Sequence, residues 1–93
     1  MSQIIQLNTA RPGDRGVITR VGTRSDGATT ADAIELERRL LELGFVEGAR
    51  IELMHQGVFG GDPIALKVDD TRVALRRREA SSLTVELFAQ AAE

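Results

Sequence analysis

The first residue to consider for metal chemistry is His55, the single histidine of the chain. It lies in phase with Ile51 and Leu53, which are expected to face inward on a strand. The carboxylates that could complete a metal site are Asp62, Asp69 and Asp70. One imidazole with scattered carboxylates is a weak pattern. We therefore expect a partly buried histidine at a strand end, with no metal ligands and no cofactor.

Serine nucleophiles have no better support. Ser25, Ser81 and Ser82 lie in no nucleophile motif, and the histidine is the sole imidazole that could act as their base. Asp69 and Asp70 are adjacent, which is typical of a turn and not of a general acid and base. We expect no catalytic residues and no enzymatic activity.

Residues 57–63 predict a glycine-rich loop between two strands. This loop lacks the lysine of a phosphate-binding loop and opens no helix, so nucleotide binding is not expected. Val58 and Phe59 would lie at its tip, where large apolar residues often act as contact anchors. The alternative is that Phe59 closes one end of the fold.

Two other features could contact a partner. Ile34 and Leu41 are seven residues apart on a predicted helix, so they form a stripe beside its core-facing side. The stripe is either a docking surface or the margin of a broad core face. Arg76–Arg78 could together contact phosphate or an acidic partner, or they could be solvated or paired with Glu79 within the chain. No aromatic residue lies near these arginines, so nucleic acid is not an expected partner.

The helix expected from Asp32 is the clearest local prediction. Asp32 can cap it, because Glu35 stands three residues on, at the capping-box spacing. Gly44 is placed to take the left-handed conformation after the last turn, and Phe45 can then fold back onto the helix. The core-facing positions are Ala33, Leu36, Leu40 and Leu43.

Short alternating apolar runs predict the strands, with a tight hairpin at Asp69-Asp70. The runs lie at residues 4–7, 15–21, 51–53, 64–68, 73–75 and 83–87. Residues 22–31 are expected to form a mobile loop and 79–82 a helical turn. The pattern predicts a mostly β fold, a small barrel or sandwich of about five antiparallel strands with one α-helix inserted after the second.

Composition limits the classes of protein that need consideration. The chain has 93 residues, 42% of them hydrophobic, and supports one domain over 1–93 with a frayed tail from about 87 to 93. It has no cysteine, which excludes disulfides and thiolate metal sites. No apolar run approaches the roughly 20 residues that span a bilayer, and no signal peptide is evident. We expect a cytoplasmic protein that is not embedded in a membrane.

A set of motifs runs in order along most of the chain, from Leu7 and residues 13–16 to about Val85. Its most specific part is 39–45, which reads Arg-Leu-Leu-Glu-Leu-Gly-Phe, together with Gly48. It continues through 60–64, Gly-Gly-Asp-Pro-Ile, and ends with Ala-Leu-Arg-Arg at 74–77 and Glu-Ala at 79–80. This ordered set of motifs resembles the FeoA family.

This resemblance implies an SH3-like barrel and a non-catalytic adaptor role in ferrous iron uptake. The implied partner is FeoB, the membrane GTP-binding iron transporter, contacted on its cytoplasmic side; a weak homodimer is also considered. The residues expected to bind it are Val58, Phe59, Ile34, Leu41 and Arg77. Two alternatives stay open: an SH3-like regulatory or scaffolding module with another protein partner, and a metal-sensing domain that uses His55.

Overall fold

Six strands and three helical segments make up the fold in the computed structural model, which describes residues 3–22 and 31–88 except the side chain of Phe59. The strands are β1 (Gln3–Gln6), β2 (Arg15–Val21), β3 (Arg50–Phe59), β4 (Asp62–Val68), β5 (Thr71–Leu75) and β6 (Leu83–Leu87). The helical segments are the 3-10 turn η1 (Leu7–Thr9), α1 (Ala31–Glu42) and α2 (Arg77–Ala80). The predicted loop at 22–31 lies mostly outside the described residues.

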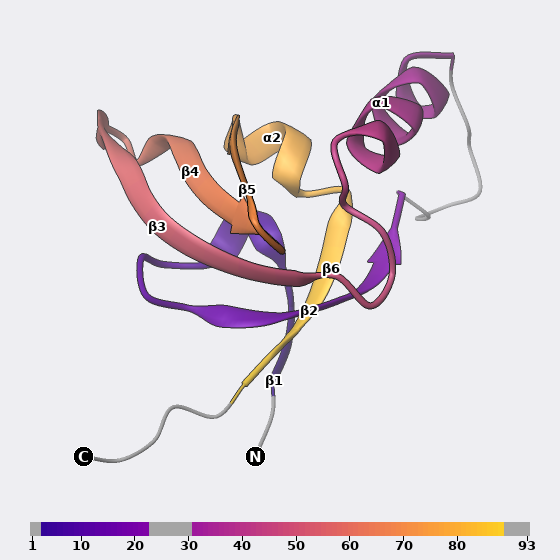
Figure 1. Cartoon of the computed structure of the whole chain (residues 1–93). Helices are drawn as coiled ribbons and strands as arrows, with labels where there is room; N and C mark the ends of the chain where they lie inside the picture. Colours follow the sequence, from indigo (N-terminus) through magenta and orange to yellow (C-terminus); the bar gives the residue numbers. More distant parts are fainter. Residues whose placement is uncertain (1–2, 23–30, 89–93) are drawn as a thin grey trace.

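All six strands form one antiparallel sheet in the order β1-β6-β2-β3-β4-β5. The mostly β prediction is confirmed, and α1 follows the second strand as expected. The sheet has six strands where about five were predicted, because Gln3–Gln6 pairs along β6 with Ile5 opposite Val85. Figure 1 shows the strands curving around the interior, with α1 projecting at one end, and the start of β1 and the end of β6 at the other.

The core lies on the inner face of this curved sheet and is almost entirely aliphatic. The predicted inward positions on β3, β4 and β6 are confirmed, since Ile51, Leu66 and Val85 are all buried. Leu87 belongs to β6, so the last strand extends into the range expected to fray. The buried hydrophobic residues are Leu7, Ala10, Ile18, Leu40, Phe45, Ala49, Ile51, Leu53, Ile64, Leu66, Val68, Leu75, Ala80, Leu83 and Val85.

Helix α1 ends as the sequence predicts. Gly44 has φ +107°, and its N–H donates to the carbonyl of Leu41 at 3.1 Å. The N–H of Phe45 donates to the carbonyl of Leu40 at 3.0 Å, and the Phe45 ring is fully buried. These two bonds form a Schellman motif. The predicted beginning is wrong: Asp32 lies inside the first turn of α1, which already includes Ala31, so it is not the cap.

The β3–β4 hairpin differs from the predicted loop. Strand β3 extends to Phe59 and β4 begins at Asp62, so the turn is only Gly60-Gly61, with φ of +70° and +75°. Positive φ at both central residues is the hairpin geometry that matches the twist of the strands. Gly57 is needed for another reason: a Cβ there would lie 1.9 Å from the carbonyl oxygen of Asp62.

Two other local predictions can be compared with the structure. The tight β4–β5 turn is confirmed, and Asp69 takes a positive φ of +51° there. The helical turn expected at 79–82 lies two residues earlier, as α2, because the side chain of Glu79 accepts a hydrogen bond from the backbone N–H of Arg76 at 3.0 Å. No helix within the described ranges is long and apolar enough to cross a bilayer.

Candidate protein-interaction surfaces

Four large apolar side chains are exposed on α1 and the segment after it. Ile34 is 56% exposed and Leu41 42%. Leu43, which was predicted to face the core, is also exposed, and so is Val46. Leu40, next to Leu41, is fully buried, so the core-facing side of the helix is narrow. Ile34 and Leu41 therefore lie outside the core face, and their role in docking stays a prediction. We call these four residues the α1 apolar surface.

An ion pair connects helix α1 to helix α2. Arg39 Nη2 lies 2.9 Å from Glu79 Oε2, which ties α1 to α2. The sequence had offered solvation or pairing with Glu79 for Arg76–Arg78. Arg76 and Arg78 are exposed, and no ion pair within the described part of the chain joins the three arginines to Glu79. The ion pair comes from α1 instead, because the fold brings two helices 40 residues apart together.

Val58 is the most exposed large apolar residue described, at 88%, and lies near the tip of the β3–β4 hairpin. It belongs to a strand and not to a loop, which corrects the prediction. Phe59 is the last residue of β3, and its side chain lies outside the described part of the chain. In Figure 1 the hairpin tip and α1 lie on opposite sides of α2, so Val58 is not brought together with Ile34 and Leu41.

Arg77 lies at the start of α2 and faces into the fold. Its guanidinium donates four hydrogen bonds, and its backbone N–H donates a further one to Asp62 Oδ1 at 2.8 Å. The guanidinium acceptors, at 2.7 to 3.1 Å, are the carbonyls of Asn8, Ala10 and Gly61 and the Oε1 atom of Gln56. Arg77 thus joins the β3–β4 hairpin to the chain around η1. The sheet is not closed by pairing between its two edge strands, β1 and β5.

His55 is exposed, which corrects the expectation of a partly buried side chain. The β3–β4 register shifts between Leu53 and His55, so the strand gains one residue and the alternation of its side chains reverses. The described residues contain no group of three or more His, Cys, Asp or Glu side chains that could hold a metal ion. The predicted ligand set of His55 with Asp62, Asp69 and Asp70 is therefore not assembled here.

The serine side chains show no catalytic arrangement among the residues described. Ser82 is buried, and the hydroxyl of Ser81 donates to the carbonyl of Arg78 at 2.7 Å. Ser25 lies outside the described residues. Asp69 and Asp70 form the β4–β5 turn, as their adjacency predicts.

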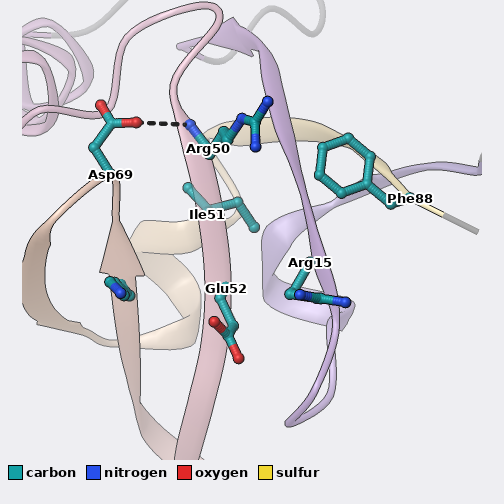
Figure 2. Close-up of a pocket in the computed structure, with 7 residues that line it drawn as sticks. Arg15, Arg50, Ile51, Glu52, Asp69 and Phe88 are labelled. Atoms are coloured by element: carbon teal, nitrogen blue, oxygen red, sulfur yellow. Dashed lines mark hydrogen bonds between the residues drawn. The ribbon is translucent and has the colours of Figure 1, made fainter. Parts of the chain in front are cut away.

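A small pocket that sequence reasoning missed lies on the outer face of the sheet, between β2, β3 and β4. Its volume is about 170 Å³. We call it the β2–β3 pocket. It is lined by Arg15, Arg50, Ile51, Glu52, Lys67, Asp69 and Phe88. Figure 2 shows the side chain of Arg50 extending from β3 toward β2, while the carboxylate of Glu52 points away from it.

The strand register explains how these residues meet. Arg15 on β2 pairs with Glu52 on β3, and Glu52 pairs with Lys67 on β4. The N–H of Phe88 donates to the carbonyl of Arg15 at 2.8 Å, which places Phe88 at the end of the same row. The alternation of each strand could have shown that these residues point outward. The register between strands distant in sequence is a tertiary property and could not.

Comparison with known proteins gives a consistent result. The FeoA domain family matches residues 5–87. A curated relative, the Fe(2+) transport protein A/Fe(2+) transporter FeoB fusion protein of Porphyromonas gingivalis, is 32% identical over 84 residues. The match covers 90% of this chain and 9% of the fusion protein, so the chain corresponds to a small part of that relative.

Solved structures support the same fold. The FeoA protein of Chlorobium tepidum has a TM-score of 0.72 at 28% identity, over 95% of this chain and 74% of that one. A zinc-complexed FeoA of Stenotrophomonas maltophilia, described as an SH3 domain protein, has a TM-score of 0.65 at 30% identity. That match covers 87% of this chain and 88% of the other. The expected SH3-like architecture is confirmed.

Proposed function

The chain belongs to the FeoA family, and from this premise we propose that it is a non-catalytic accessory protein of ferrous iron uptake that binds the cytoplasmic part of a FeoB-type transporter. The observation that carries the proposal is the relative in which the FeoA and FeoB portions are one polypeptide. Covalent fusion keeps two domains at a high effective concentration, which favours a contact between them. A separate chain would have to make the same contact through its own surface.

Two apolar features support binding through that surface. Exposed large apolar side chains are costly in water unless they meet a partner, and contact anchors are commonly of this type. The α1 apolar surface supplies Ile34 and Leu41, and the hairpin supplies Val58. We include Phe59 because it follows Val58 in β3, and Arg77 because it holds the hairpin through Gly61.

The lack of an assembled site is consistent with an adaptor that has no chemistry of its own. Within residues 3–22 and 31–88, the serines, the histidine and the aspartates considered for catalysis do not meet in one place. We propose that the chain acts from the cytoplasm, where the partner region lies, as a single domain that binds the transporter. The proposed role of the chain is association with the transporter, and the chain itself carries out no catalysis in this proposal.

The test joins association with transport. The tagged chain is purified from membranes that contain the cognate transporter, and ferrous iron uptake is measured in a strain that lacks this chain. We expect the transporter to co-purify and uptake to fall, with recovery when the chain is supplied again. Normal uptake in the deletion strain together with no detectable association would contradict the proposal.

A further inference from the structure

The β2–β3 pocket has more positive than negative charge available to a ligand. It holds three cationic side chains, Arg15, Arg50 and Lys67, and two carboxylates. One carboxylate is already used, because Asp69 Oδ1 accepts a hydrogen bond from the backbone N–H of Arg50 at 3.2 Å (Figure 2). Glu52 is therefore the one lining carboxylate that accepts no such hydrogen bond from a backbone N–H.

Glu52 does not neutralise the three cationic side chains through ion pairs. It sits between Arg15 and Lys67 in the strand register, yet forms an ion pair with neither. Within the described residues, no carboxylate oxygen lies within 4.0 Å of a side-chain nitrogen of the three cations. A further carboxylate would thus meet unpaired donors, and arginine binds carboxylates with favourable two-point geometry.

An apolar wall accompanies these charges. Phe88 is 46% exposed, and its backbone is fixed beside Arg15 by the bond to the Arg15 carbonyl. Ile51 also lines the pocket, but it is only 3% exposed and packs in the core, so Phe88 is the apolar side chain open to a ligand. A ligand with a short aliphatic stem and an acidic end matches this combination, since the stem can cover the ring while the carboxylate faces the arginines.

The pocket is small. Sites for small molecules and cofactors typically enclose about 300–1,000 Å³. The β2–β3 pocket, at about 170 Å³, is below this range and is large enough for one side chain. We propose that it receives an aspartate or glutamate side chain from an acidic segment of the protein partner. This inference rests on the proposed function and assigns part of the contact to the outer sheet face.

The experiment uses the full chain and the purified cytoplasmic region of the cognate FeoB-type transporter. Affinity is measured by calorimetry for wild type and for the double variant Arg15→Glu with Arg50→Glu. The matched control is Arg11→Glu with Arg20→Glu, which changes the net charge equally at two exposed positions outside the pocket. Measurements at raised salt screen long-range effects of net charge.

We expect the pocket variant to bind at least about tenfold more weakly and the control within about threefold of wild type, because a close charge pair contributes more than a distant one. Replacing acidic residues of the transporter region by lysine, one at a time, should identify one whose change restores binding to the pocket variant. Circular dichroism checks that each variant is folded. Arg15→Gln with Arg50→Gln provides a second test without charge reversal.

The outcomes separate the two proposals. If wild type binds the transporter region and the pocket variant binds equally well, the pocket assignment is overturned and the proposed function stands. If wild type does not bind at all, both are overturned. If the pocket variant loses only self-association in sedimentation experiments, the occupant is a second copy of this chain, and the assignment to the partner is wrong.

Discussion

At the scale of single residues, Arg77 gives the sharpest contrast between sequence pattern and structure. In the sequence it belongs to a run of three arginines that suggests an exposed basic patch. In the fold its guanidinium is part-buried and bonded to three carbonyls and one amide. Its neighbour Arg78 is exposed, and its guanidinium has no hydrogen-bond or ion-pair partner within the described part of the chain.

Replacing Arg77 should therefore destabilise the protein. Arg77→Gln removes most of the donors for the carbonyls of Asn8, Ala10 and Gly61, and unpaired part-buried acceptors are costly. We expect the free energy of unfolding to fall by about 2–3 kcal/mol, measured by urea denaturation. Arg78→Gln is the matched control and should change stability by less than about 0.5 kcal/mol. Equal effects of the two changes would contradict this role of Arg77.

Partner binding through Arg77 stays a prediction. Because the guanidinium holds Gly61 at the hairpin turn, the residue can influence binding by positioning the hairpin that carries Val58. Arg77→Lys separates the two roles, since lysine keeps the charge but cannot bond four acceptors in a plane. Unchanged transporter affinity with lowered stability would assign Arg77 to the fold alone.

At the scale of elements, α1 is anchored on one side and exposed on the other. Leu40 and the Schellman motif fix its C-terminal end to the core, and Arg39 bonds α2 through Glu79. Ile34 and Leu41 take no part in these contacts with the core. The helix can therefore lose its outer apolar residues without losing its attachment.

The double variant Ile34→Ser with Leu41→Ser tests this separation. We expect unfolding free energy within about 1 kcal/mol of wild type, because both side chains are exposed, and at least tenfold weaker binding to the transporter region. Glu35→Ser with Glu42→Ser is the control on the same helix, where exposed ion pairs to Arg38 contribute little. Loss of the fold in the first variant would show that Ile34 and Leu41 are structural.

At the scale of the whole molecule, metal binding is the property to separate from adaptor function. A relative from Stenotrophomonas maltophilia was solved with zinc. In this chain His55 is exposed, and the described residues group no three metal-ligating side chains. The register shift after Leu53 turns the imidazole away from the core positions that the sequence pattern indicated.

Calorimetric titration of the purified chain with ferrous or zinc ions should show no saturable site at micromolar concentrations. The physical reason is that one exposed imidazole without neighbouring ligands binds divalent ions weakly. His55→Ala should give the same titration curve as wild type. A saturable heat that disappears in His55→Ala would contradict this and revive the metal-sensing alternative.

Much of the fold follows from local sequence. The alternating runs predicted about five of the six strands, and Gly44 with Phe45 specifies the end of α1, because turn and cap geometry depend on a few adjacent residues. The Asp69-Asp70 turn and the family resemblance follow in the same way. The predicted start of α1 and the predicted β3–β4 loop were wrong. The exact ends of helices and strands depend on small differences in local energy, and tertiary contacts decide between them.

By itself, then, the sequence determined the strands, the inserted helix and the family, which are properties of neighbouring residues and their order. The tertiary structure alone decided which side chains are free for a partner. Arg77 was turned inward by acceptors almost 70 residues away, His55 was turned outward by a bulge, and Arg15, Glu52 and Lys67 were aligned by strand register. Each of these depends on pairing between segments distant in the chain, which periodicity within one segment does not encode.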